Sequence, residues 1–305
     1  MLMVMISSSE APVVIALGLV VGVVLSHIDR RGGGGGVPSR VRSAAAAATV
    51  GVVGWVLPLA LSFSMVGQFR WWPEVLPIAA GVIAVLVVGS GATEPMTADG
   101  FVPDLRRRGP LTFSRGAEVA AAAAVAGVLA LTVLGAGLIS SQDEEGRYAS
   151  IMIPIGNATA STEFFGWYYG VPVMAATVVL AVVTLSRLHR VARAPRTDTD
   201  RAGDDLRRRD RSSAVLRSAT AALLLTLGSA WQLVAQGSSL RTSIPLTEAG
   251  TIEFGTSLAA LGPVLGFSSH CVVGLGLALV IAQLLGRGRS GASAGVGTDP
   301  RPVRA

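Results

Sequence analysis

Lysine is missing from this chain of 305 residues, and charged residues make up only 14% of it. All 25 basic residues other than histidine are therefore arginines. A retinal Schiff base needs a lysine amine, so that chemistry is excluded. Hydrophobic residues reach 51%, and the mean hydropathy is +0.59. This balance is typical of a membrane protein and not of a soluble domain.

Cysteine occurs once, at Cys271, which excludes an internal disulfide. Catalytic templates are also missing: the sequence has no HExxH, GxSxG, Walker loop or CxxC, and no histidine and carboxylate set at ligand spacing. The Asp204-Asp205 pair stands among arginines, as in a solvated, self-neutralising charge run. We therefore expect no catalytic residue, metal or cofactor, and the sequence favours a protein that is not an enzyme.

Seven apolar segments are each long enough to cross a hydrocarbon core of ~30 Å as a helix. Barrel strands would alternate instead, so we expect an all-α membrane protein with seven transmembrane helices. Residues 1–290 would form one membrane domain, and 291–305 a disordered cytoplasmic tail. The segments are 11–27, 44–65, 75–91, 117–140, 168–186, 214–236 and 258–285.

The arginines orient these helices. Arg70, Arg147 and Arg241 follow the second, fourth and sixth segments, and the remaining 22 of the 25 arginines lie on the opposite side. By the positive-inside rule, the N-terminus is outside and the C-terminus inside. A signal peptide is the competing interpretation of residues 1–27, but no basic residue precedes the apolar run and no cleavage pattern closes it.

The same arginine excess predicts contact with anionic lipid at the cytoplasmic face, and no nucleic acid is expected as a partner. Alanine, glycine, valine and arginine are abundant while lysine is missing, which indicates a GC-rich bacterial genome. We therefore expect a multi-pass protein of a bacterial plasma membrane.

Two short polar segments interrupt the apolar pattern on the outer side. RTSIPLTEAGTIEFG, residues 241–255, alternates as strands near 242–247 and 251–254 would, around a turn at 248–250. RYASIMIPIGNATASTEFFG, residues 147–166, has the same order of parts, with Gly156-Asn157 as its turn. Because an isolated hairpin is marginally stable in water, we expect the two to join as a small extracytoplasmic β-hairpin cap.

The similarity between these segments extends into the helices beside them, which predicts parallel two-helix units at 39–92, 104–200 and 205–289. The first unit lacks a hairpin. Chance similarity between helices rich in alanine and valine is the alternative. The matching residues are Pro154 with Pro245, Glu163-Phe164 with Glu253-Phe254, Pro172-Val173 with Pro263-Val264, and Asp104-Leu105-Arg106 with Asp205-Leu206-Arg207.

One candidate site lies inside the membrane. In the last apolar segment, Pro263 is followed by Ser268, Ser269 and His270. A proline within a helix frees carbonyl groups that could line a cavity. The alternative is a kink with His270 hydrogen-bonded to a neighbouring helix. In both cases we expect the His270 ring to face the bundle interior, because a polar ring in lipid is costly.

A second candidate site lies on the outer side, where each arginine is followed by a glutamate near the next helix. The pairs are Arg70 with Glu74, Arg147 with Glu163, and Arg241 with Glu253. They are either salt bridges that pin the loops, worth ~0–1 kcal/mol when exposed, or a recognition surface for anionic groups, sugars, lipids or a partner protein. The candidate residues of that surface are Arg147, Glu163, Arg241 and Glu253.

Carboxylates deep within the apolar segments are missing, which argues against transport coupled to ions. We therefore predict a binding or partner subunit of a membrane complex, whose outer hairpins contact a ligand or protein. A small-molecule permease, with the last helix lining the route, is the alternative.

Overall fold

The computed structural model describes residues 46–51, 70–89, 109–155, 158–194, 201–246 and 250–285. Most of this part is helical, and five of its helices are long and apolar enough to cross a membrane by length and composition. Residues 46–51 are helical as well. The five helices are α5 (Trp72–Gly89), α6 (Gly116–Ile139), α7 (Trp167–Arg193), α8 (Arg201–Ser238) and α9 (Gly262–Leu285).

These helices coincide with the last five predicted segments, from 75–91 to 258–285, and they support a membrane protein. The predicted segments 11–27 and 44–65 lie outside the described residues, apart from the helical residues 46–51. The tail at 291–305 also lies outside them. Seven spans and their orientation therefore stay predictions.

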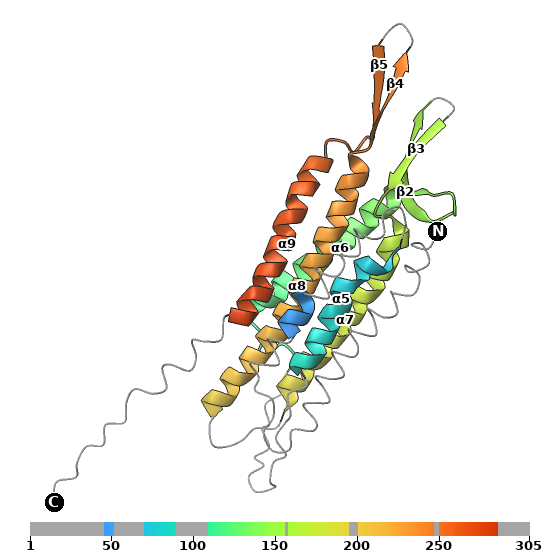
Figure 1. Cartoon of the computed structure of the whole chain (residues 1–305). Coiled ribbons are helices and arrows are strands. Elements are labelled where there is room, and N and C mark those ends of the chain that lie inside the picture. The colour runs from blue at the N-terminus through green and yellow to red at the C-terminus, as the bar shows by residue number, and fades with distance from the viewer. Residues whose placement is uncertain are drawn as a thin grey trace, which may run out of the picture.

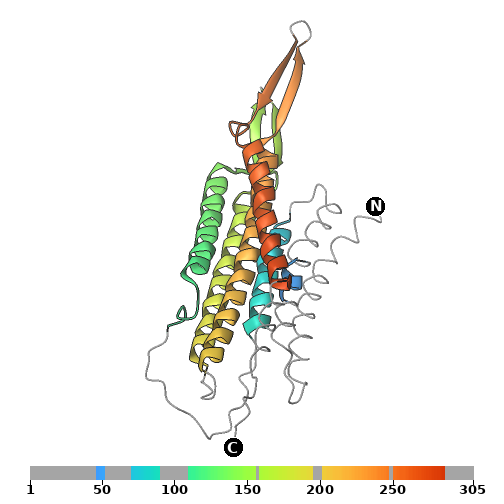
Figure 2. The ribbon, with the colours of Figure 1, turned by 90° about the vertical axis from the view of Figure 1, so that its left-hand side faces the viewer.

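The helices form one elongated bundle with α8 at its centre (Figures 1 and 2). α8 packs against α5, α6, α7 and α9. The apolar part of α8 is 78% buried, compared with 22% for α6 and for α9. Leu138 of α6 is 79% exposed and Phe267 of α9 is 74% exposed. Apolar side chains on such outer faces are suited to contact lipid, so α8 forms the core and its neighbours the surface.

Small residues set the closest approaches between helices. A Cβ atom added at Gly81 of α5 would lie 2.4 Å from the Cβ of Ala222 in α8, and one added at Gly228 would lie 2.4 Å from Cγ2 of Val273 in α9. Across the α6–α8 contact, Trp231 Nε1 donates a hydrogen bond of 3.0 Å to Thr132 Oγ1. Close backbones and polar contacts of this kind hold helices together where lipid removes the hydrophobic driving force.

Both helix pairs, α6–α7 and α8–α9, are joined by β-strands at the same end of the bundle, here called the hairpin end (Figure 1). Between α6 and α7 lie β1 (Ser141–Gln142), β2 (Tyr148–Ile155) and β3 (Ala158–Glu163). Between α8 and α9 lie β4 (Arg241–Leu246) and β5 (Gly250–Gly255). The strands predicted at 242–247 and 251–254 therefore exist; β4 begins and ends one residue earlier than predicted, and β5 extends one residue further at each end.

The two hairpins do not, however, join in one sheet, so that part of the expected cap is wrong. The strands form two sheets, one in the order β1-β2-β3 and one of β4 and β5 alone. β3 pairs with β2 from Ser150 to Ile155, and β1 pairs with β2 only at Tyr148 and Ser150. β5 lies near β2 but does not join its sheet. The β4–β5 hairpin instead projects beyond the ends of the helices (Figures 1 and 2).

The two hairpins nevertheless share a pairing pattern. Pro154 lies opposite Thr159 in the first, and Pro245 lies opposite Thr251 in the second. Each proline is therefore one pair away from the turn of its hairpin. This agrees with the sequence matches, while the larger two-helix units stay a prediction.

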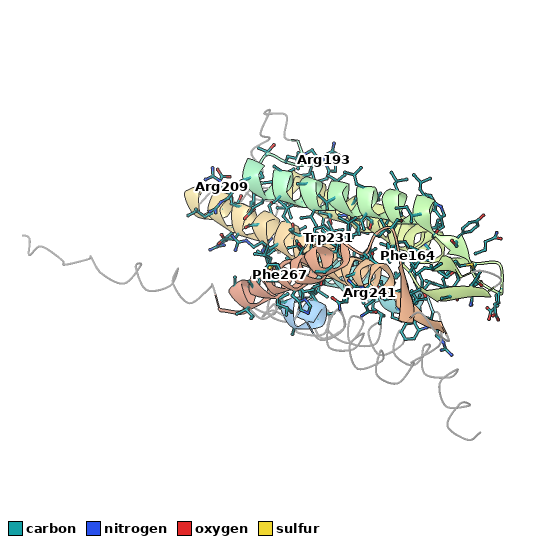
Figure 3. The ribbon with its side chains drawn as sticks, turned by 90° about the horizontal axis from the view of Figure 1, so that it is seen from above. Phe164, Arg193, Arg209, Trp231, Arg241 and Phe267 are labelled. Carbon is teal, nitrogen blue, oxygen red and sulfur yellow. The ribbon has the colours of Figure 1, made fainter. Side chains whose placement is uncertain are left out.

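The opposite end of the bundle, here called the arginine end, carries Arg193 and Arg209, whereas Phe164 and Arg241 lie toward the hairpin end (Figure 3). Helices extend further here than predicted, because α7 continues to Arg193 and α8 begins at Arg201. Arg208 is only 4% exposed. The charge run around Asp204 is thus a helix with a buried arginine and not a solvated loop.

Candidate functional site

The predicted site around Pro263 takes a different form in the structure. α9 begins at Gly262, so Pro263 lies in the first helical turn and not inside a continuous helix. A proline in the first turn interrupts no helical hydrogen bond, because the N–H groups of that turn have no carbonyl partner within the helix. The expected kink and its freed carbonyls are therefore wrong.

His270 also departs from expectation, because its side chain is exposed on α9 and not turned into the bundle. Its Nδ1 lies 2.6 Å from the carbonyl oxygen of Gly266, one turn earlier, which gives the polar ring a partner on its own helix. Ser268 is half-buried, and Ser269 is buried. Ser269 Oγ contacts Gln232 Oε1 of α8 at 2.8 Å, so this serine joins two helices.

The outer-side arginine Arg147 is part of a compact turn between β1 and β2. Its Nε donates to Asp143 Oδ2 at 2.8 Å, and its Nη1 lies 2.6 Å from Glu145 Oε2. Its guanidinium also lies over the Tyr168 ring, 5.2 Å from the centroid. The predicted pairing of Arg147 with Glu163 is therefore replaced by pairing within the turn.

The carboxylate of Asp143 is the centre of this turn. Burial disfavours its charged form, but hydrogen bonds from the backbone N–H and guanidinium of Arg147 and the backbone N–H of Glu145 outweigh burial and hold the pKa of Asp143 below its usual value. Gly146 closes the turn with φ of 76°, a conformation that glycine adopts without strain.

Replacing Asp143 with asparagine should therefore open this turn. We expect trypsin to cleave after Arg147 severalfold faster in Asp143→Asn at neutral pH, and at an unchanged rate in the control Glu144→Gln.

The same turn should depend on pH. Because the pKa of Asp143 is lowered on folding, the stabilisation that its carboxylate provides is present above the unfolded pKa of ~3.9 and is lost as the pH falls through the folded value. Hydrogen exchange of the 143–149 amides at stepped pH would measure that loss, and equal protection in both variants would contradict the assignment.

Glu163, at the end of β3, is turned toward the helices. Its Oε1 accepts a hydrogen bond of 2.5 Å from the hydroxyl of Tyr169 in α7. Tyr169 is 1% exposed, and Phe164 and Phe165 beside Glu163 are fully buried. The aromatic side chains fix the junction of β3 and α7, so Glu163 has a fixed position beside the bundle.

Glu74, which was predicted to pair with Arg70, is a half-buried residue of α5. It lies in the first turn of this helix, and its Oε2 is buried without a hydrogen-bond partner among the described residues. Its pairing with Arg70 stays a prediction.

The remaining two predicted residues lie on the projecting hairpin. Arg241 begins β4 with an exposed side chain, and its backbone is paired with Gly255. The backbone of Glu253 in β5 is paired with Ser243, while its side chain lies outside the described part of the chain. Of the four predicted outer residues, the structure therefore ties Arg147 to its own turn and Glu163 to the bundle.

Comparisons with protein-family models, with curated proteins and with solved structures find no match to this chain. Within the described residues, no three or more His, Cys, Asp or Glu side chains are grouped as a metal site would need. The functional interpretation therefore rests on the shape of the hairpin end.

Proposed function

We propose that this chain is a multi-pass subunit of a bacterial plasma-membrane complex and that it binds a protein partner through the β4–β5 hairpin on the extracytoplasmic side. The observation that carries the proposal is the projection of this hairpin beyond the helices (Figures 1 and 2). In the part of the chain that the structure describes, β4 and β5 pair only with each other.

Strand edges explain why such a hairpin favours a partner. A two-stranded hairpin is marginally stable alone, and each open edge presents unpaired N–H and C=O groups. A partner strand added to one edge satisfies these groups and stabilises the hairpin, which is a common way for proteins to bind extended segments.

The orientation rests on the arginines. Helices α7 and α8 carry arginines at the arginine end, including Arg190, Arg193, Arg207 and Arg209. The positive-inside rule places that end in the cytoplasm, where these side chains would contact anionic lipid. The hairpin end then faces outward.

A photo-crosslinking residue at Thr251 of β5 tests the binding function in cells of the source organism. We expect one discrete adduct with a second protein, formed in intact cells. The control position is Leu138, 79% exposed on α6, where lipid and not protein is the expected neighbour. No adduct at Thr251, or equal protein adducts at both positions, would contradict the proposal.

Orientation is checked separately in a Cys271→Ser background with a cysteine at Gly250, the first residue of β5. A maleimide that cannot cross membranes should label this cysteine in intact cells. Labelling only after permeabilisation would place the hairpin inside and overturn the proposed topology.

The second candidate function is a small-molecule permease, which the buried carboxyl oxygen Oε2 of Glu74 favours. A polar group inside a helix bundle is a frequent element of a substrate or ion route. The sequence had suggested that the last helix, α9, lines the permeation route. At this place, however, Ser269 of α9 contacts Gln232 of α8, so the two helices are joined there.

A further inference from the structure

We propose that the protein partner joins the outer edge of β5, and not that of β4, by adding an extended strand that carries a basic residue opposite Glu253. The inference rests on the proposed function, because it specifies how the β4–β5 hairpin would bind its partner. It is carried by the pairing register of the hairpin and by the position of one proline, Pro245, within it.

Pro245 determines which residues of the hairpin are hydrogen-bonded to each other. In an antiparallel pair of strands, facing residues alternate between pairs that exchange both N–H···O=C bonds and pairs that exchange none. Pro245 faces Thr251, and a proline has no N–H to donate. This pair therefore exchanges no bonds, and the pairs on both sides of it, such as Ile244 with Ile252, are the bonded ones.

The alternation then fixes which backbone groups point away from the hairpin. Residues in pairs without bonds turn their N–H and C=O groups outward. On β4 these residues are Arg241, Ser243 and Pro245, and on β5 they are Thr251, Glu253 and Gly255. Every outward residue of β5 thus has an N–H to donate, whereas β4 lacks one at Pro245.

Pro245 therefore protects the edge of β4. Its ring carbon Cδ occupies the place of the amide hydrogen, so a carbonyl group of an added strand would find no donor there. Proline is one of the residues with which proteins keep strand edges from pairing. The sequence of β5 contains no proline, so an added strand would find a donor at every outward position of that strand.

The first hairpin provides a check on this use of proline. Pro154 of β2 faces Thr159 of β3, so this pair also exchanges no bonds. Continuing the alternation along the two strands makes Ala149 and Phe164 a bonded pair. The N–H of Phe164 does donate to the carbonyl oxygen of Ala149, at 2.8 Å. The position of the proline thus gives the correct bond pattern in the hairpin where a separate hydrogen bond can be compared with it.

The edges of the first hairpin are less open than that of β5. β1 pairs with β2 at Tyr148 and Ser150, and Pro154 lies further along the same edge. On β3, the carbonyl oxygen of Glu163 lies 2.9 Å from a Cβ atom added at Gly237 of α8, so the base of this edge rests against the bundle. β5 lies near β2 without pairing with it, and its hairpin projects beyond the helices (Figures 1 and 2).

Glu253 defines the chemistry of the partner strand. It is the middle residue of the outward row on β5, so an added strand places one residue directly opposite it. Opposite charges at facing positions stabilise a pair of strands, and like charges destabilise it. A basic residue is therefore favoured in the partner. A second copy of this chain, paired antiparallel along the whole row, would place Glu253 opposite Glu253, which disfavours self-association through this edge.

Proline substitution in the facing pair of Ser243 and Glu253 separates the two edges. The hairpin itself uses neither of these N–H groups, so a proline at either position leaves the bonds between β4 and β5 in place. The crosslinking residue at Thr251 is kept in both variants. We expect Glu253→Pro to lower the yield of the adduct in intact cells by about tenfold or more, because a partner carbonyl loses its donor. Ser243→Pro, the matched control, should lower it by less than about twofold.

Glu253→Gln tests the charge alone, because it keeps the backbone N–H. We expect it to lower the adduct yield by about twofold to fivefold, as for the loss of one facing pair of opposite charges. The further loss in Glu253→Pro is then due to the missing donor. An unchanged yield in Glu253→Gln would overturn the basic residue that we assign to the partner.

Three results would overturn the assignment to β5. Loss of the adduct in Ser243→Pro alone would place the partner on β4, and equal yields in the two proline variants would show that the edges are not distinguished. An adduct of twice the mass of the chain would identify the partner as a second copy. If the chain with the crosslinking residue at Thr251 and no other change forms no adduct, the proposed function itself fails, which is a different outcome from these three.

Discussion

Leucine in place of Gly81 should prevent the bundle from assembling. The Cβ of any side chain at this position would lie 2.4 Å from the Cβ of Ala222 and 3.6 Å from Cδ1 of Leu180, so α5 would have to move away from α8. Overpacking a close contact typically costs 1–3 kcal/mol, and a clash that moves a helix costs more. We expect loss of the monodisperse species in size-exclusion chromatography, or a fall in melting temperature of more than about 5 °C.

The matched control is Gly127→Leu on α6. No atom lies within 4 Å of a Cβ added at Gly127, and the position is exposed on the outer surface of the bundle. Leucine there should leave the melting temperature unchanged or raise it slightly, since glycine is a poor helix former. If Gly81→Leu behaves like Gly127→Leu, the close packing of α5 on α8 is refuted.

Methionine in place of Arg208 should destabilise the arginine end. Arg208 Nε lies 2.8 Å from Asp204 Oδ2, and its Nη1 donates to the carbonyl oxygen of Val191 in α7 at 2.9 Å. Its guanidinium also lies 5.7 Å from the Phe113 ring centroid. Methionine retains much of the stem but removes the charge, which leaves Asp204 and the Val191 carbonyl without this donor. Because Asp204 is 21% exposed, we expect a cost of about 3 kcal/mol, the lower end of the range for broken buried pairs.

Arg209→Met is the control for this change, because Arg209 is the exposed neighbour on the same helix. The two variants remove the same charge from the same turn, so a difference in denaturant or thermal unfolding isolates the buried contacts. Equal stability of the two variants would show that the Arg208 contacts contribute nothing measurable.

Hydropathy was sufficient to predict the five described helices, because each one crosses a long apolar window that local sequence defines. Alternation and turn residues likewise predicted β2 to β5, since the strand period and the turn glycines are local signals. The two-residue β1 carried no such signal. Whether two hairpins share one sheet depends on how the helices that carry them are packed, which local sequence does not define, so their separation into two sheets could not be predicted from the hairpins alone.

The candidate site was harder to predict because it depends on contacts between distant segments. Glu74 resembles an ordinary helix-start glutamate paired with Arg70, and the burial of its Oε2 depends on the packing of α5 against α7 and α8, which no local pattern defines. The orientation of His270 was predicted wrongly for a different reason. Its apolar surroundings in sequence suggested burial, but the face of α9 that meets α8 is occupied by Ser269 and Val273, leaving His270 on the other side.

The length of α8 has a mechanical consequence. Its 38 residues make a rod of about 57 Å, nearly twice the hydrocarbon thickness of ~30 Å, so a large part of it stands clear of the membrane. The rod is directly followed by the second hairpin, since β4 starts at Arg241 and Thr256 Oγ1 donates to the carbonyl oxygen of Ser238 at 2.5 Å. Only Ser239 and Leu240 separate the rod from β4, so a tilt imposed on the rod at the arginine end would be carried to the base of the hairpin.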